Sequence, residues 1–234
     1  METETHILAA TWTEVEGRFA GYDDLAHGWE HTQRVYHLAL RLAEQEHANR
    51  FIVGMAALLH DLGRTTKDPA RTHAERSAIL ATTLLAPDEL PLATQHAIMH
   101  AILAHSYSRG VAPATLEARV LYDADRLDSL GASGLLRWAM TVTHRRWPET
   151  KTYHPQDPFA THRVPDDKHY LLDRLFTRLL TLEEHMTTAS GKIMAQRRTA
   201  FLRLYLQEFQ LELQEAGLNA ELEERSGIVN IAPI

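Results

Sequence analysis

The sequence contains no cysteine, and this absence narrows the chemistry that the protein can perform. A chain without cysteine cannot build a disulfide framework, a zinc finger, an iron–sulfur cluster or a thiol nucleophile. Any metal ion that the protein binds must therefore be held by nitrogen and oxygen atoms. Histidine, which supplies nitrogen ligands, is abundant, with 15 copies among 234 residues.

The chain also lacks an excess of positive charge and a long apolar segment. It has 24 Lys and Arg against 31 Asp and Glu, a formal charge of −7, which argues against broad binding to nucleic acid or to an anionic membrane. The longest apolar run, residues 51–59, is too short to span a bilayer. The first ten residues, METETHILAA, show no signal peptide. We therefore expect a cytoplasmic protein with neither nucleic-acid nor membrane partners.

Glycine and proline are scarce, at 11 and 9 residues, and apolar residues recur at helical spacing. Leu202, Leu206, Phe209 and Leu213, for example, fall on one face of a helix predicted within residues 193–215. Alternating strand patterns bounded by turn residues are absent from the sequence. The sequence therefore predicts an all-α protein of roughly eight to ten helices.

Glycine, proline and capping residues predict where several helices begin and end. One helix is expected to begin near Gly28, and another to follow Asn49 and end near Leu62-Gly63, with the glycine as its C-terminal cap. Asp68-Pro69 predicts the start of the next helix, and residues 92–105 form a further predicted helix.

The domain organisation predicted from these boundaries is a single helical domain over residues 1–217, followed by a tail at 218–234. The core motifs lie within residues 26–130, and a C-terminal helical part spans 166–217. The stretch 147–166 contains several prolines and is predicted to be irregular.

Two polar residues end a segment that is otherwise apolar almost all round. The helix predicted at 51–62 should be buried, yet it carries His60 and Asp61. Because an unpaired buried charge is costly, both side chains need partners. Metal coordination would satisfy the two residues together. A structural arrangement, with Asp61 capping a neighbouring helix and His60 hydrogen-bonded in the core, is the alternative.

Further candidate ligands occur before and after this pair. His27 and His31 are four residues apart and share a helical face. Later in the chain, three carboxylates stand beside large apolar residues, which suggests that they point inward. They are Asp123, Asp125 and Asp128. A set of two histidines and two aspartates suits an octahedral ion such as manganese, magnesium, iron or cobalt.

The order of these residues resembles the signature of the HD-domain metal-dependent phosphohydrolase superfamily, matched here by His31, His60-Asp61 and Asp125. Flanking segments resemble the bacterial branch that includes nucleotide pyrophosphohydrolases. They are AHGWEH at 26–31, LHDLG at 59–63, AHSYS at 104–108, DADRLD at 123–128, DPF at 157–159 and DDK at 166–168. The likeness covers most of residues 20–210 and implies an all-α HD-domain helical bundle.

The resemblance implies that one divalent ion is bound by His31, His60, Asp61 and Asp125. Manganese or magnesium is expected first, with iron, cobalt and nickel as alternatives. Water activated by the ion would hydrolyse a phosphate anhydride or ester in a small phosphorylated molecule, in particular a nucleotide. Such an enzyme would be a nucleotide phosphatase or pyrophosphohydrolase.

Supporting roles are predicted for several other residues. His105 is a candidate general acid for the leaving group, or else a helix-end histidine bonded to a carbonyl. Asp128, grouped with Asp61 and His105 as catalytic, is expected to hold Arg126 or a ligand rather than the metal. The candidates for binding substrate are His27, which could instead orient His31, and the cations Arg34, Arg163 and Lys168.

Three alternatives stay open at the level of the sequence. Some HD proteins hold two metals, and His73 and His105 could bind a second ion bridged by Asp61. The surplus histidines also allow a di-iron HD-type oxygenase, and the same fold could serve as a non-catalytic nucleotide sensor. His96 and His100 share a helical face and are equally well explained as surface residues. The oligomeric state is left undetermined.

Overall fold

The computed structural model describes residues 2–86, 90–106, 110–145 and 150–218. Within these ranges the chain forms eight α-helices, three short helices of other types and no β-strand, which confirms the all-α prediction. The α-helices are α1 (Glu2–Phe19), α2 (Trp29–Glu46), α3 (Arg50–Leu59), α4 (His73–Leu85), α5 (Leu92–His105), α6 (Leu116–Leu127), α7 (Gly131–Arg145) and α8 (Ala189–Glu215). None of the described helices is both long enough and apolar enough to span a membrane.

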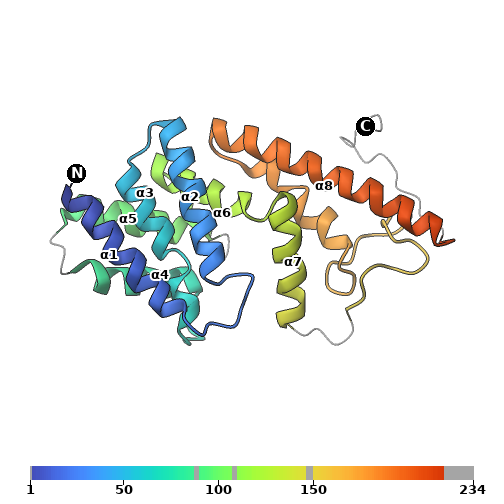
Figure 1. Cartoon of the computed structure of the whole chain (residues 1–234), viewed down its shortest axis with the longest axis horizontal. Coiled ribbons are helices and arrows are strands. Elements are labelled where there is room, and N and C mark those ends of the chain that lie inside the picture. The colour runs from blue at the N-terminus through green and yellow to red at the C-terminus, as the bar shows by residue number, and fades with distance from the viewer. Residues whose placement is uncertain (1, 87–89, 107–109, 146–149, 219–234) are drawn as a thin grey trace.

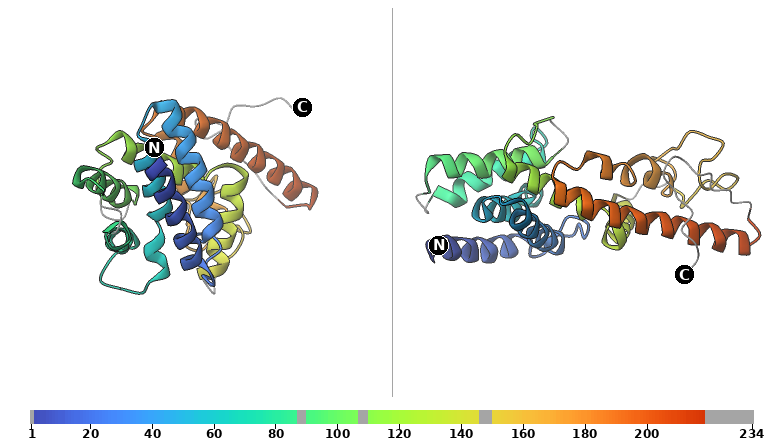
Figure 2. Two further views of the ribbon diagram at one scale, coloured as in Figure 1. Left: turned by 60° about the vertical axis from the view of Figure 1, so that its left-hand side comes forward. Right: turned by 90° about the horizontal axis from the view of Figure 1, so that it is seen from above.

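The first six helices form a bundle at one end of an elongated molecule (Figure 1). Helix α7 lies near the middle of the molecule, just beyond the bundle, and residues 150–172 and the C-terminal half of α8 lie at the other end (Figure 1). Helix α8 runs from the bundle along the length of the molecule, as the right-hand view of Figure 2 shows. Residues 150–172 have little regular structure apart from an isolated bridge between Lys151 and Tyr170, as expected from their prolines.

Helix α3 is the central element of the bundle. It packs against α1, α2, α4, α5 and α6, and nearly all of its side chains are buried. Its first turn is capped by Asn49, whose side chain accepts hydrogen bonds from the backbone N–H groups of Phe51 and Ile52. The predicted burial of this segment is confirmed, so the residues that follow α3 emerge in the interior of the bundle.

The predicted C-terminal end of this helix was wrong by several residues. Helix α3 ends at Leu59, and a short 3-10 helix follows at Leu62–Thr65. Gly63 is not a left-handed cap, since its φ is not positive. Its role is close packing, because a Cβ atom there would lie 2.3 Å from the carbonyl oxygen of His73 and 2.5 Å from the backbone nitrogen of Ser77. The glycine thus lets the chain after α3 touch the start of α4.

The predicted start of the next helix at Asp68-Pro69 was also wrong. The Asp68 side chain accepts a hydrogen bond from Ala70 N and holds a turn instead. Helix α4 begins at His73, after a reciprocal capping box in which Thr72 and Glu75 bond to each other's backbone N–H. This cap fixes His73 in the first turn, next to the end of α3.

The N-terminal end of α8 is anchored to the bundle through buried polar contacts. The carboxylate of Asp123 on α6 accepts hydrogen bonds from the backbone N–H and hydroxyl groups of both Thr187 and Thr188. Further along α8, Leu202, Leu206 and Leu213 are buried, as the predicted apolar face requires. The tail predicted at 218–234 lies, except for its first residue, outside the described residues.

Candidate metal centre

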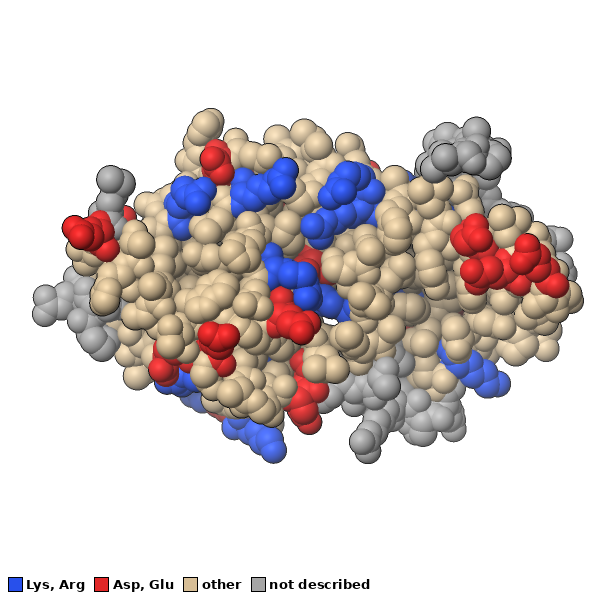
Figure 3. Space-filling view, in the orientation of Figure 1, with Lys and Arg blue, Asp and Glu red and all other residues tan. Residues whose placement is uncertain are grey.

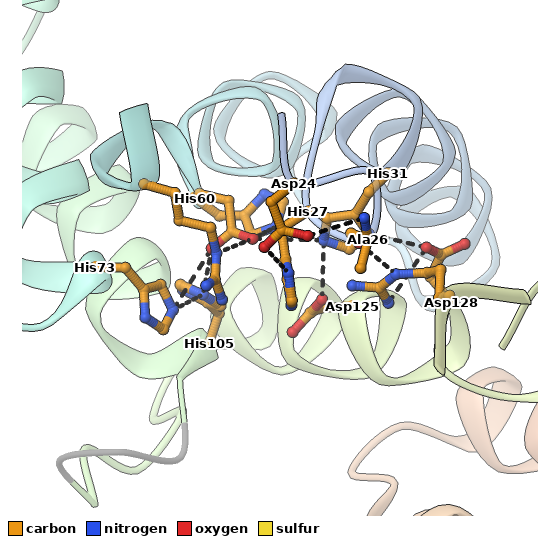
Figure 4. A network of polar contacts seen from close by, with 12 residues as sticks. Asp24, Ala26, His27, His31, His60, His73, His105, Asp125 and Asp128 are labelled. Atoms are coloured by element: carbon orange, nitrogen blue, oxygen red, sulfur yellow. Dashed lines mark hydrogen bonds and ion pairs between the residues drawn. The ribbon is translucent and has the colours of Figure 1, made fainter. Parts of the chain in front are cut away.

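Six polar side chains from five segments converge inside the bundle. Figure 4 labels all of them except Asp61. They are the four residues predicted to bind one metal ion together with the two predicted for a second ion. His31 comes from α2, His60 and Asp61 follow α3, His73 begins α4, His105 ends α5, and Asp125 lies on α6. Helix ends supply most of these groups, because the chain must leave a buried helix at the point where the cluster lies.

The carboxylate of Asp61 lies at the centre of the cluster. Its Oδ2 is 3.6 Å from Nε2 of His31 and 3.7 Å from Nε2 of His60. Its Oδ1 is 3.5 Å from Nε2 of His73 and 3.7 Å from Nε2 of His105. The two oxygens of one carboxylate therefore face two different pairs of imidazole rings.

The fourth predicted ligand, Asp125, completes the side of the cluster that contains His31. Its Oδ1 is 3.4 Å from Nε2 of His31. His31, His60 and Asp125 offer ligand atoms within 4.8 Å of one another, and so do His60, Asp61 and His105. Both triads have the spacing at which side chains can share a metal ion.

The outer ring nitrogen of three histidines is already bonded to an acceptor. Nδ1 of His31 donates to Oδ2 of Asp128 at 2.8 Å. Nδ1 of His60 donates to the Ala57 carbonyl at 2.7 Å, and Nδ1 of His105 donates to the Ile102 carbonyl at 2.6 Å. In a neutral ring with hydrogen on Nδ1, Nε2 carries a lone pair. Three lone pairs are therefore directed at the Asp61 carboxylate.

This arrangement places hydrogen-bond acceptors close together, with few hydrogen-bond donors between them. Nε2 of His31 and Nε2 of His60 are 3.3 Å apart, and Nε2 of His73 and Nε2 of His105 are 3.2 Å apart. Oδ1 of Asp61 is buried and accepts no hydrogen bond from any described residue. Acceptors this close repel one another unless a cation lies among them. The donor set of imidazole nitrogen and carboxylate oxygen fits a divalent ion such as manganese, iron or magnesium.

The histidine pKa values keep the rings in the form that can bind a metal. Burial, together with the neighbouring His105 and His31, lowers the pKa of His60 to about 4. Burial likewise lowers the pKa of His73 to about 3. Both rings are therefore neutral at pH 7, as coordination requires.

The two carboxylates of the cluster are held in the ionised form. Burial acts to raise the pKa of Asp61, but the cation Arg64 and His60 outweigh it and hold that pKa well below the usual range. The pKa of Asp125 is also lowered, because His31 and His60 outweigh the effect of burial. Ionised carboxylates beside neutral histidines form a negatively charged site for a cation.

Asp128 supports His31 and does not face the other ligands. Besides the His31 ring, it accepts hydrogen bonds from Nε and an NH2 group of Arg34 at 2.7 and 3.1 Å, and it forms an ion pair with Arg137 at 3.3 Å. Asp128 was expected to hold Arg126 or a ligand rather than the metal, and of these two partners Arg126 is not bonded to it. Arg126 donates to the carbonyls of His105 and Tyr122, because side chains two positions apart do not face each other at a helix end.

Two other predicted residues lie beside the cluster. Nδ1 of His27 donates to Oδ2 of Asp24 at 2.8 Å, and the His27 ring meets the His31 ring edge to face with centroids 6.0 Å apart. Arg34 reaches Asp128 on the Nδ1 side of His31, whereas the cluster lies on the Nε2 side. His27 is thus placed to orient His31, and Arg34 lies behind the predicted metal ligands.

The remaining predicted substrate residues are not brought into the cluster. Arg163 forms an ion pair with the buried Asp173 and donates to the Asp157 carbonyl, since a buried carboxylate needs a counter-charge. Lys168 is exposed in the same segment. His96 is exposed, and Nε2 of His100 accepts a hydrogen bond from Ala114 N. These contacts support structural or surface positions for the four residues.

The structure also adds residues that the sequence had not indicated. Nε of Arg64 lies 2.7 Å from Oδ2 of Asp61, which makes it the cation next to the central carboxylate. Its position three residues after Asp61 was an available signal. Arg137 donates to the Ala26 carbonyl and pairs with Asp128 from α7. No local pattern around Arg137 predicts this contact.

Comparisons with known proteins agree with this geometry. The HD domain model matches residues 28–130, a range that contains His31, His60-Asp61 and Asp125. The protein YpgQ from Bacillus subtilis (strain 168) is 29% identical over 201 residues, covering 83% of this chain and 87% of the relative.

Solved structures show the same fold. The crystal structure of Bacillus subtilis YpgQ in complex with ADP has a TM-score of 0.68 and 26% identity, covering 90% of this chain and 96% of that chain. The structure of an HD-superfamily hydrolase from Bacillus thuringiensis has a TM-score of 0.70 and 25% identity, covering 90% of this chain and 98% of that chain. The predicted metal-ligand residues lie within the matched range, and the chain is similar to the HD-domain superfamily in sequence and in fold.

Proposed function

We propose that the protein is a metal-dependent phosphohydrolase that cleaves a phosphate anhydride or ester of a small phosphorylated molecule, in particular a nucleotide. The observation that carries this proposal is the convergence of imidazole Nε2 atoms on the two oxygens of Asp61. The resemblance to a protein crystallised with ADP supports a nucleotide substrate. The resemblance to an HD-superfamily hydrolase supports the reaction class.

The ligands in this proposal are His31, His60, Asp61 and Asp125. A divalent ion held by them would polarise a phosphoryl oxygen and lower the pKa of water, supplying a nucleophile at neutral pH. The chain's contribution is to hold the ligands in place. The carbonyl of Ala57 keeps the His60 ring aligned through its Nδ1–H, and Asp128 does the same for His31.

Arg64 is the residue that we assign to the substrate phosphate. Its Nε lies 2.7 Å from Oδ2 of Asp61 and its side chain is 24% exposed, so a phosphate at the metal centre would meet a cation that solvent can reach. Burial opposes the charge on Arg64, but Asp61 outweighs that effect and raises its pKa, so the cation persists. A planar guanidinium suits the oxygens of a phosphoryl group.

His105 has two incompatible roles in this proposal. Its Nε2 can bind a second ion together with His73, or it can carry a proton for the leaving group, but one nitrogen cannot do both. Its Nδ1–H is already donated to the Ile102 carbonyl, so Nε2 is the atom at issue. The number of metal ions per chain distinguishes the two roles, because a second bound ion removes His105 as a general acid.

The proposal is tested by measuring phosphate and pyrophosphate release from a panel of nucleotides, with and without manganese. Hydrolysis that requires the metal and disappears in Asp61→Ala is the expected result. Absence of hydrolysis by protein shown to contain its metal would reject the proposal. Nucleotide binding without any turnover by that protein would instead support the alternative of a non-catalytic sensor.

A second candidate function follows from the two-sided contacts of Asp61. Each carboxylate oxygen faces its own histidine pair, an arrangement that can bridge two metal ions. A di-iron centre that activates oxygen would use the same residues. Two iron equivalents per chain together with oxygen consumption would support it, and one bound ion with phosphate release would reject it.

A further inference from the structure

A groove lies between α2 and the N-terminal half of α8, behind His31 and apart from the metal centre. It consists of two adjoining hollows of about 730 and 770 Å³, which share Leu38, Arg41 and Arg198. Its wall on one side includes Asp128, which bonds to Nδ1 of His31, whereas Asp61 faces Nε2 of that ring. Each hollow has a size typical of a small-molecule site.

Four arginines line this groove, although the whole chain has a charge of −7. They are Arg34, Arg41, Arg197 and Arg198. The space-filling view shows basic side chains gathered over the junction of α2 and α8 (Figure 3). Arg41 and Arg197 are exposed, and within the described part of the chain no carboxylate forms a salt bridge with either. Two cations are therefore available to an anion from solution.

The carboxylates of the groove are largely occupied. Asp128 accepts from His31 and Arg34, and Oε1 of Glu46 accepts from both the backbone N–H and the hydroxyl of Ser190 at 2.6 Å. Glu30 is the exposed acidic group, 4.0 Å from an NH1 atom of Arg34. The carboxylates of the groove therefore neutralise only part of the positive charge of its arginines.

The remaining lining residues offer both polar and apolar contacts. His37, Ser133 and Gln33 supply hydrogen-bonding groups near the arginines. Leu38 and Ile193 supply apolar surface beside them, and the Ile193 side chain is mostly exposed. A ligand that combines a phosphate with an apolar or aromatic group would use both kinds of surface. Arg198 is anchored by donating to the Leu127 carbonyl, so one cation is already positioned.

We propose that this groove binds a small phosphorylated anion at a site separate from the metal centre. The phosphate oxygens would accept hydrogen bonds from Arg41 and Arg197, for which guanidinium geometry is well suited. The apolar part of the ligand would cover Leu38 and Ile193. This second site goes beyond the proposed hydrolysis, since none of the exposed groove arginines is a predicted metal ligand.

The test is a calorimetric titration of the full chain with ADP and with pyrophosphate. EDTA is present, so that no metal ion at the metal centre can bind either probe. Arg41→Ala/Arg197→Ala is compared with a control of equal charge change, Arg50→Ala/Arg178→Ala. Both control arginines lie outside the groove, in exposed ion pairs with Glu44 and Asp167. Asp61→Ala serves as a second control, which alters the metal centre and leaves the groove intact.

We expect the groove variant to bind the probes at least about tenfold more weakly than the wild type, and both controls to stay within about twofold. Tighter binding of ADP than of pyrophosphate would support the contact with Leu38 and Ile193. Equal affinity of the groove variant and the wild type would overturn the proposal. So would binding that is lost in Asp61→Ala, or wild-type protein that binds neither probe.

Discussion

Asp128 accepts a hydrogen bond from Nδ1 of His31 at 2.8 Å, although 97 positions separate the two residues in the sequence. This bond fixes the tautomer of His31 and turns the Nε2 lone pair toward Asp61. Arg34 and Arg137 hold the carboxylate from the other side. The metal affinity should therefore depend on a residue that does not touch the metal.

Replacing Asp128 by asparagine tests this dependence. The amide keeps the size of the side chain but loses the negative charge that favours Nδ1–H of His31. We expect manganese to bind about 10- to 100-fold more weakly, measured by equilibrium dialysis at pH 7. Asp167→Asn, which removes an exposed carboxylate paired with Arg178, is the control and should bind as the wild type does. An unchanged affinity in folded Asp128→Asn would refute the positioning role.

Gly63→Ala should destabilise the fold at the metal centre. The new Cβ atom would meet backbone atoms of His73 and Ser77 on α4, and neither can move without shifting that helix. We expect the free energy of unfolding to fall by about 1–3 kcal/mol in urea denaturation. Gly17→Ala in α1 is the matched control, because no atom lies near its added Cβ. That variant should be up to about 1 kcal/mol more stable, and equal effects of the two changes would contradict the packing role.

The stability of the metal-free protein should decrease as the pH falls from about 6.5 toward 4. The pKa of His60 is about 4 in the folded protein and near 6.5 in the unfolded chain, so only the unfolded chain binds a proton in this range. The stabilisation is complete above pH 6.5 and is lost as the pH drops through the window, by about 3 kcal/mol for this residue. His60→Asn should lessen the slope of unfolding free energy against pH, and His6→Asn on the exposed face of α1 should not. A flat wild-type profile would contradict the buried neutral state.

Arg64→Met should separate metal binding from substrate binding. Removal of the guanidinium frees Oδ2 of Asp61 from its ion pair, so manganese should bind more tightly. The substrate loses its cationic partner, so KM for the hydrolysed nucleotide should rise about tenfold. Dialysis and steady-state kinetics measure the two effects. Weaker metal binding together with an unchanged KM would reject this assignment.

The sequence predicted those parts of the centre that follow from local pattern. His60 and Asp61 end an apolar helix, and a buried helix that ends in polar groups needs an interior partner. The acidic residues set among large apolar ones indicated Asp123, Asp125 and Asp128, and the resemblance to the HD-domain family selected Asp125 among them. The helix at residues 92–105 was also placed correctly, because Pro91 directly precedes its first residue.

Contacts between residues that are far apart in the sequence could not be predicted from local pattern. Arg34 was predicted to bind phosphate, yet the fold places it against Asp128 from another helix. Gly63 was interpreted as a helix cap, because a glycine that permits close packing has the same local signature as one that permits a left-handed turn. The partner of Arg163 could not be predicted from local pattern either, because Asp173 comes next to it only through the folding of the irregular segment.

The most direct test of the central claim is manganese binding at neutral pH by the wild type and by Asp61→Asn, with circular dichroism to confirm that both are folded. The lone pairs converging on Asp61 predict at least one tightly bound ion per wild-type chain. Asparagine at this position should weaken binding more than about a hundredfold, because it removes the shared ionised ligand. Equal binding by the two proteins, or absence of tight binding by the wild type, would contradict the assignment of this cluster as a metal centre.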